Sequence, residues 1–169
     1  STTLRRYPSK NTDMPSRYAR AIALHRQGQL DTALREIDAL IALTPNSPWF
    51  HELKGQVNYE AGRAANGLAA YKKSVELAPD QPLLLIGLAT TQLSIAETSD
   101  EMSQKFNLAA EKNLRKAIRL DPANTTAYFQ LSKAFGQMQR VAYAEWALAE
   151  YYALLGRPES LKHARRAIK

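Results

Sequence analysis

Apolar residues recur along most of the chain at intervals of three and four, the spacing that places them on one face of an α-helix. Glycine and proline interrupt this pattern at regular places. Gly28 and Gly62 are 34 residues apart, and so are Pro45 and Pro79. A two-helix unit that returns with this period predicts an array of helix-turn-helix repeats.

The apolar spacing and the interruptions together predict a series of helices. They cover residues 15–27, 31–43, 48–61, 65–78, 82–96, 103–120, 125–138, 141–154 and 158–168. Gly28 and Gly62 are predicted to end their helices in a left-handed cap, which glycine adopts without a steric penalty. Pro48 and Pro82 are predicted in the first turn of the next helices, where the missing N–H has no partner to lose.

The third return of the pattern is delayed. Pro122 follows Pro79 by 43 residues, so the third unit holds nine residues more than the period of 34 requires. We place this insertion near residues 96–104, and we expect it to form a mobile excursion or to lengthen the flanking helices.

The periodicity predicts three parts of the chain. Residues 1–14 form a linker or N-terminal extension, and residues 15–156 form four repeats. Residues 157–169 form a last helix, which has no partner helix after it and therefore caps the stack.

The units resemble the tetratricopeptide repeat (TPR), a family with small residues where paired helices approach and large apolar residues where one repeat meets the next. The matching positions are Ala21, Ala33, Ile37 and Pro45; Gly55, Gly67, Tyr71 and Pro79; Leu88, Ala89, Ala110, Leu114, Ala117 and Pro122; and Leu131, Ser132, Phe135, Ala144 and Leu148. His51 and Asn58 depart from the family, which usually has aromatic residues there. The resemblance implies an all-α TPR helix-turn-helix solenoid of four repeats plus a C-terminal capping helix.

Composition supports the helical prediction and excludes other classes. The 169 residues include 27 alanines and 22 leucines but only three valines and seven isoleucines, which argues against a β-sandwich or barrel. There is no cysteine, so disulfides, cysteine-ligated zinc and thiol catalysis are excluded. No apolar run is long enough to cross a bilayer, and residues 1–8 lack a secretory signal. We therefore expect a cytosolic protein or a piece of a longer one.

The formal charge is +7, yet the basic residues are concentrated at the two ends. Residues 1–20 carry a net charge of +4, residues 157–169 carry +4, and the residues between them sum to −1. A protein that wraps nucleic acid along its length is basic along its length. The distribution therefore favours solvated basic ends, and we expect no nucleic-acid partner.

The nearest approach to a catalytic motif is His51-Glu52-Leu53-Lys54-Gly55, which begins like the zinc motif H-E-x-x-H. The second histidine is replaced by Gly55, so a metal site is not predicted. The histidines at 25, 51 and 163 are too far apart for local ligand spacing, and the glycines never cluster into a phosphate loop. We interpret the chain as a non-enzyme without catalytic residues, metal or cofactor.

Stacked repeats line a concave side with the first helix of each pair, and this side is the candidate partner-binding groove. The predicted groove residues are Tyr18, His25, Trp49, Glu52, Gln56, Tyr59, Leu93, Phe129 and Lys133. Trp49, Tyr59 and Phe129 are the strongest anchors, because exposed aromatic residues contribute most to binding. Ile22 and Ile86 fit the core equally well. The basic Arg165 and Arg166 are expected only to steer the encounter.

One subclass of the family clamps the acidic C-terminal carboxylate of cytosolic chaperones with lysine and asparagine. The matching positions here are Tyr18, Ile22, Leu53, Leu83 and Gly87, and none of these side chains can bind a carboxylate. An extended or apolar polypeptide segment is therefore the favoured ligand.

Three segments carry a closer resemblance: residues 6–21, residues 50–56 and residues 161–167. They are similar to the C-terminal TPR region of bacterial periplasmic zinc metalloproteases of the BepA type. The resemblance implies the substrate- or partner-binding domain of a larger periplasmic protease that acts in envelope protein quality control and outer-membrane protein assembly. The protease domain of the same full-length chain is a second candidate partner. No catalytic residue carries over, because the 169 residues contain no protease half.

Two other classes stay open. A free-standing cytosolic TPR scaffold or adaptor would share every repeat feature, and the upstream reading frame would separate the two. A module that binds nucleic acid or an anionic membrane through its basic ends is less favoured. Salt-sensitive retention on heparin would support that class.

Overall fold

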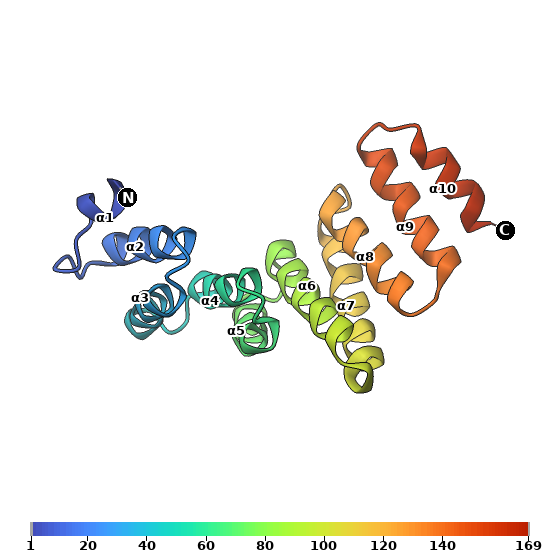
Figure 1. The fold of residues 1–169 in the computed structure, drawn as a ribbon. Coiled ribbons are helices and arrows are strands. Elements are labelled where there is room, and N and C mark those ends of the chain that lie inside the picture. The colour runs from blue at the N-terminus through green and yellow to red at the C-terminus, as the bar shows by residue number, and fades with distance from the viewer. Residues whose placement is uncertain (1, 169) are drawn as a thin grey trace. The chain divides into compact units, whose positions relative to one another are not determined.

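The structure of the protein is a computed structural model that describes residues 2–168 (Figure 1). In this part of the chain every regular element is an α-helix, which confirms the all-α prediction. The helices are α1 (Thr2–Arg6), α2 (Met14–Arg26), α3 (Leu30–Leu43), α4 (Pro48–Glu60), α5 (Ala64–Leu77), α6 (Pro82–Thr98), α7 (Asp100–Leu120), α8 (Thr125–Gln137), α9 (Val141–Leu154) and α10 (Glu159–Ala167).

The helices form two compact units, Ser1–Ala78 with α1–α5 and Pro79–Lys169 with α6–α10. We call them unit 1 and unit 2. In unit 1 the pairs α2/α3 and α4/α5 pack as helix-turn-helix repeats, and in unit 2 the pairs α6/α7 and α8/α9 do the same. The last helix, α10, packs on α9, as a capping helix would.

Glycine ends the first helix of both repeats in unit 1, as predicted. Gly28 and Gly62 have φ angles of +72° and +73°, in the left-handed region. In unit 2 the corresponding turn between α8 and α9 uses Gln139 instead, at φ +58°. A residue with a Cβ is strained there by about 1 kcal/mol, so this turn is less favourable than its counterparts.

The insertion lengthens the two helices that flank it. Helix α6 continues to Thr98 and α7 begins at Asp100, so only Ser99 separates them. The predicted helix over 103–120 therefore starts three residues earlier than its sequence pattern indicated. Two acidic residues in the first turn of α7, Asp100 and Glu101, favour this start because they complement the positive end of the helix dipole.

The N-terminal segment, expected as a linker, contains the short helix α1 and is tied to the first repeat by Arg20. The Arg20 side chain is buried and donates to the carbonyl oxygens of Pro8 at 2.9 Å and Asn11 at 2.7 Å. Its other nitrogens donate to both carboxylate oxygens of Glu36, and Arg17 binds the same carboxylate. Arg17 and Arg20 are therefore structural, although the sequence analysis counted them with the solvated basic end.

Small residues allow α4 and α5 to approach closely. A Cβ on Gly67 would lie 2.8 Å from the carbonyl oxygen of Gly55, and a Cβ on Gly55 would overlap the ring of Tyr71. Tyr71 thus fills the space above Gly55 in its own helix pair, whereas the sequence comparison assigned the large residue to the gap between repeats. Such contacts fix the pair, because neither glycine tolerates a larger side chain.

Each unit has its own apolar core. In unit 1, Ala21, Ile37, Leu53 and Val57 form one buried cluster from α2, α3 and α4. In unit 2 the largest fully buried apolar side chains come from α6, α7 and α8: Leu84, Leu85, Leu93, Leu114, Leu131 and Phe135. These cores hold the exposed faces of the helices in fixed positions.

Candidate functional site

Unit 1 carries six of the predicted groove residues on two helices, α2 and α4. Within each helix they are spaced by three, four or seven residues and therefore share one side of it. We call this set the α2/α4 face; its residues are Tyr18, His25, Trp49, Glu52, Gln56 and Tyr59.

Glu60 brings two of these residues together. His25 Nε2 donates to Glu60 Oε2 at 2.6 Å, which joins α2 to α4, and Gln56 Nε2 donates to Glu60 Oε1 at 2.8 Å. Glu60 was not among the predicted groove residues, although its position one turn after Gln56 was a usable signal. The imidazole and the amide hold the Glu60 carboxylate in one orientation.

Glu52 is the second carboxylate of the α2/α4 face. Burial raises the pKa of Glu52, and the negative charge of Glu60 raises it further. The hydrogen bond from His25 lowers the pKa of Glu60, against the opposing effect of burial. Within residues 2–168 no hydrogen bond or ion pair holds the Glu52 carboxylate. The two neighbouring carboxylates therefore differ: one is paired and ionised, and the other lacks a donor.

Aromatic side chains complete the α2/α4 face. Tyr18 and Trp49 are each 47% exposed, a large fraction for such side chains, and Tyr59 is half-buried. Tyr71 of α5 is not part of this face, but Glu52 and Glu60 act on it. Burial, together with these two negative charges, raises the pKa of the Tyr71 phenol, which therefore stays neutral. The face thus combines exposed apolar rings with a carboxylate that can accept hydrogen bonds.

In unit 2 the structure separates the remaining predicted groove residues. Leu93 is only 1% exposed and belongs to the core, so it does not line an open surface. The reason is that α6 is apolar on all sides and is covered by both α7 and α8. Ile86 is buried as well. Phe129 is 41% exposed, and its ring centroid lies 5.3 Å from that of Tyr151.

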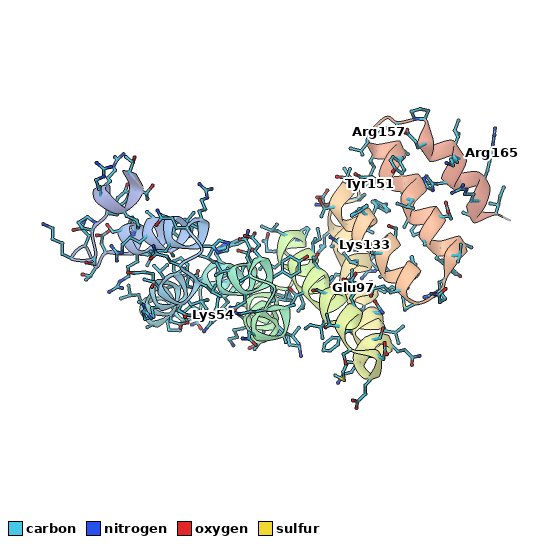
Figure 2. The ribbon with its side chains drawn as sticks, viewed as in Figure 1. Lys54, Glu97, Lys133, Tyr151, Arg157 and Arg165 are labelled. Carbon is cyan, nitrogen blue, oxygen red and sulfur yellow. The ribbon has the colours of Figure 1, made fainter. Side chains whose placement is uncertain are left out.

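Lys133 and the insertion meet at Glu97. Lys133 Nζ lies 3.8 Å from Glu97 Oε1, and Gln137 Nε2 donates to the same oxygen at 2.8 Å. Figure 2 labels Lys133, Glu97 and Tyr151 on this part of unit 2. Glu97 was missed as a site residue because its partners lie on another helix, 36 and 40 residues further along the chain.

The two arginines predicted to steer partners differ. Arg165 is exposed on α10 (Figure 2), whereas Arg166 Nη1 lies 3.5 Å from Glu145 Oε1. His163 also pairs with Glu145 and stacks on Tyr152. The positive charge of Arg166 is therefore partly compensated by Glu145, which also connects α10 to α9.

The histidine of the H-E-x-x-H-like segment has a structural role. His51 Nε2 donates to the carbonyl oxygen of Pro45 at 2.8 Å, which connects α4 to the preceding turn. In residues 2–168 no group of three or more His, Cys, Asp or Glu side chains could hold a metal ion. Nor is any helix in that range both long and apolar enough to cross a membrane.

Residues 18–82 match the model of the tetratricopeptide-repeat family. This match and the solved structures described next support a tetratricopeptide-repeat domain. The matched stretch covers α3–α5 and most of α2, and it contains the whole α2/α4 face. A comparison with curated protein sequences finds no match.

Solved structures agree on the fold. MamA from Desulfovibrio magneticus RS-1 aligns with a TM-score of 0.73 at 18% identity, over 89% of this chain and 78% of that one. A thermophilic TPR protein of Thermus thermophilus gives 0.65 at 17% identity, over 92% and 90%. YrrB, described as a TPR protein with an unusual peptide-binding site, gives 0.61 at 17% identity, over 99% and 91%. At these identities the likeness shows the TPR fold.

Proposed function

We propose that the chain is a protein-interaction module that binds a polypeptide segment on the α2/α4 face of unit 1. The observation that carries this proposal is that the α2/α4 face holds two exposed aromatic side chains, Tyr18 and Trp49, together with the half-buried Glu52 carboxylate, which has no donor. Rings supply apolar contact area, and the carboxylate accepts a backbone N–H or a basic side chain of the segment. Peptide binding by a neighbour of the same fold, YrrB, supports this use of the scaffold.

The magnitudes favour the aromatic residues over the basic ends as the source of affinity. Exposed charge pairs contribute about 0 to 1 kcal/mol each and weaken with salt. An aromatic anchor that becomes buried in an interface contributes about 2 kcal/mol or more. Binding should therefore survive added salt, with Arg165 and Arg166 affecting mainly the rate of association.

The test compares Trp49→Ala with a variant in which Arg165 and Arg166 are both changed to alanine. The probe is an unfolded segment of an outer-membrane protein, the substrate class that the family resemblance implies. We expect the tryptophan variant to lose at least about tenfold in affinity and the arginine variant to lose little at moderate salt. Leu43→Ala on α3 is the matched control, because Leu43 is 58% exposed and lies outside the α2/α4 face.

The opposite result would replace the proposal. If the arginine variant loses most of the affinity and the tryptophan variant loses none, binding is electrostatic and uses the basic end. If Trp49→Ala and Leu43→Ala weaken binding equally, the effect is general and the α2/α4 face is not the site.

We further propose that the module serves a larger periplasmic zinc metalloprotease, as its substrate- or partner-binding domain in envelope protein quality control. The similarity of residues 6–21, 50–56 and 161–167 to the BepA-type TPR region supports this context. The chain itself is proposed to be non-catalytic and free of bound zinc, with the protease domain of the full-length protein as a second partner. A free-standing cytosolic scaffold is the alternative.

Two measurements separate these contexts. The reading frame upstream of residue 1 should encode an H-E-x-x-H motif, and cell fractionation should place the full-length protein in the periplasm. A complete gene without that motif, or a cytosolic product, would favour the scaffold. Metal analysis of the untagged chain should give no stoichiometric zinc.

A further inference from the structure

Helix α9 of unit 2 is apolar on every side, yet its first turn, residues 141–143, is exposed and most of residues 144–152 are only half-buried. Twelve of its fourteen residues are alanine, valine, leucine, tyrosine or tryptophan, and Ala147 is the one that is fully buried. Val141 and Tyr143 are 64% and 50% exposed. A helix that is apolar all round is normally covered on all sides. The exposed side of α9 therefore consists of the apolar side chains that are typical of a buried surface.

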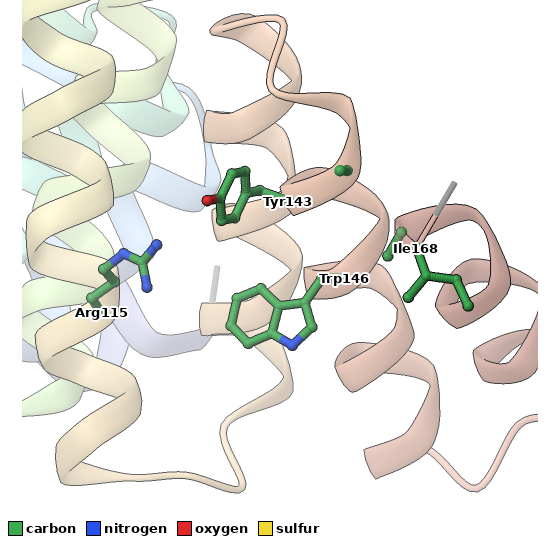
Figure 3. Close-up of a pocket in the computed structure, with 6 residues that line it drawn as sticks. Arg115, Tyr143, Trp146 and Ile168 are labelled. Carbon is green, nitrogen blue, oxygen red and sulfur yellow. The ribbon is translucent and has the colours of Figure 1, made fainter.

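A groove of about 590 Å³ lies along this exposed side (Figure 3). It is bounded by Arg115 of α7, by three residues of α9 and by the end of α10. Figure 3 shows Tyr143 and Trp146 directed toward the side where Arg115 lies, with Ile168 at the end of α10. We call it the α9 groove; its lining residues are Arg115, Ala142, Tyr143, Trp146, Ala167 and Ile168. Tryptophan, tyrosine and arginine are the residues most enriched at the energetic centres of interfaces.

The walls of the α9 groove are held in place by neighbouring aromatic and cationic groups. The guanidinium of Arg140 lies 4.4 Å from the ring centroid of Tyr143. Trp146 meets Tyr128 edge-to-face, with centroids 6.2 Å apart. The rings are thus positioned before any ligand arrives, which reduces the entropy lost on binding.

The positive charge of the α9 groove is concentrated at one wall. Arg115 and Arg140 share the single carboxylate of Glu111, which leaves an excess positive charge at one wall. On α10, Lys162 and Arg165 are exposed but do not line the groove, so they do not add to the charge of its walls. An apolar groove beside excess cations fits a ligand that carries both an apolar side chain and negative charge.

From these observations we propose that the α9 groove is a second docking surface, which binds an acidic polypeptide segment through one inserted apolar or aromatic side chain. A second copy of this chain is disfavoured as the occupant, because a symmetric contact would place the same arginines against each other. A polypeptide is favoured over an anionic surface, because the groove is a concavity of about 590 Å³ lined by rings, which side chains can enter and a flat lipid surface cannot fill. This surface is independent of the α2/α4 face.

The chain offers a built-in reporter, because Trp49 and Trp146 are its two tryptophans. In the Trp49→Phe variant, Trp146 is the sole tryptophan, and its fluorescence reports on the groove. The probe is a short synthetic peptide with a central Leu-Phe pair between flanks of Asp and Glu. Two matched peptides serve as controls, one with lysine flanks and one with Ser-Gly in place of Leu-Phe.

The acidic Leu-Phe peptide should shift the Trp146 emission to shorter wavelength and bind at least about tenfold more tightly than either control. Trp146→Ala should weaken binding by about thirtyfold when measured by calorimetry. Leu161→Ala on α10 should have no effect, because Leu161 is exposed but does not line the groove. Trp49→Ala should leave this binding unchanged.

A second pair of variants keeps the test decisive if Trp146→Ala misfolds. Ala142 is exposed in the first turn of α9, where a glutamate is compatible with the helix. Ala142→Glu should abolish binding of the acidic peptide by repulsion, whereas Ala142→Lys should preserve it. Equal affinities for these two variants would overturn the proposal.

Other occupants give distinct results that also overturn it. Vesicles of phosphatidylglycerol or a DNA duplex that shift Trp146 as strongly as the peptide would assign the surface to anionic lipid or nucleic acid. A concentration-dependent increase in mass that Ala142→Glu abolishes would assign it to a second copy. Failure of the acidic peptide to bind would refute the α9 groove proposal and leave the α2/α4 face and its own test untouched.

Discussion

The α2/α4 face of unit 1 and the α9 groove of unit 2 are both rich in aromatic residues, but their charges are opposite. Glu52 belongs to the first surface, and Glu60 binds its His25 and Gln56. Arg115 and Arg140 flank the rings of the second. A net charge of +7 describes neither surface, because most of the excess lies at the two ends of the sequence.

The difference shows what the repeat scaffold fixes and what it leaves free. Small residues and turns set the packing of each helix pair, as Gly55 and Gly67 do for α4 and α5. The exposed positions of the same helices have no role in that packing and can carry either sign of charge. A shared fold therefore does not imply a shared ligand.

The largest expected effect tests what holds the acidic surface in place. Arg20→Ala removes a buried guanidinium, which leaves two carbonyl oxygens without their donor and leaves Arg17 as the remaining donor to the Glu36 carboxylate. We expect a loss of about 3–5 kcal/mol in the free energy of unfolding, measured by urea denaturation. Arg35→Ala is the control, because Arg35 is exposed and bonds only to Thr32 of its own helix. Amide exchange should increase in α1–α3, and uniform exchange throughout both units would contradict a local role.

A smaller effect compares helix packing in the two units. Gly55→Ala should destabilise by about 1–3 kcal/mol, because its Cβ overlaps the Tyr71 ring. Gly136→Ala on α8 is the matched change in unit 2, where nothing lies within 4 Å of the added Cβ. It should stabilise by about 0.5–1 kcal/mol through helix propensity alone. Thermal unfolding should show a lower melting temperature for Gly55→Ala and a higher one for Gly136→Ala. A shift in the same direction for both variants would contradict this account.

The turns provide a third comparison. Gln139→Gly should raise the free energy of unfolding by about 1 kcal/mol, because it relieves the left-handed strain at φ +58°. Gly28→Gln is the reverse substitution in unit 1, and it should lower the free energy of unfolding by a similar amount. Gly28 has φ +72°, so the glutamine is strained, and the open space around it excludes a steric clash as the cause. Denaturation with urea measures both, and a loss of stability in Gln139→Gly would show that the side chain contributes more than the strain.

The smallest effects concern pH and the two carboxylates of unit 1. Burial raises the pKa of Glu52, so its ionisation opposes folding as pH rises above the ordinary range of a glutamate. Glu52→Gln should therefore stabilise at neutral pH, and the gain should vanish in acid. The hydrogen bond from His25 lowers the pKa of Glu60, so this group stabilises above the ordinary range and loses its effect as pH falls. Glu60→Gln should destabilise at neutral pH only. The free energy of unfolding of both variants is measured from pH 3 to 8, and a change of the same sign in both at neutral pH would contradict the assignment.

The elements of this fold could be predicted from sequence because their signals are local. Apolar spacing, Pro48 and Pro82 in first turns, and Gly28 and Gly62 in caps each act within one or two helical turns. The predicted ends of the helices between residues 15 and 96 agree with the structure to within two residues. Prediction was weakest at the start of α7, which lies three residues before its predicted position, and at the short helix α1, which was expected as a linker.

The candidate surfaces depended on contacts between residues far apart in sequence. Helical spacing alone placed Tyr18, Trp49 and Glu52 on the sides of their helices. It could not indicate that His25 would bind Glu60, 35 residues later, or that Arg20 would be buried. Leu93 had the spacing of a groove residue but lies in the core, because α6 is apolar on all sides and its neighbours decide which side is covered.

By itself the sequence determined the helices, their repeat and the lack of a metal motif, because each of these follows from residues within one turn or one period. The tertiary structure decided which side chains are exposed and which charges are paired. The same residue type has different environments in consequence: Glu60 is paired with His25, whereas Glu52 lacks a donor. Burial and electrostatics depend on distances between helices, and those distances are set by packing across the whole unit rather than by neighbours in the chain.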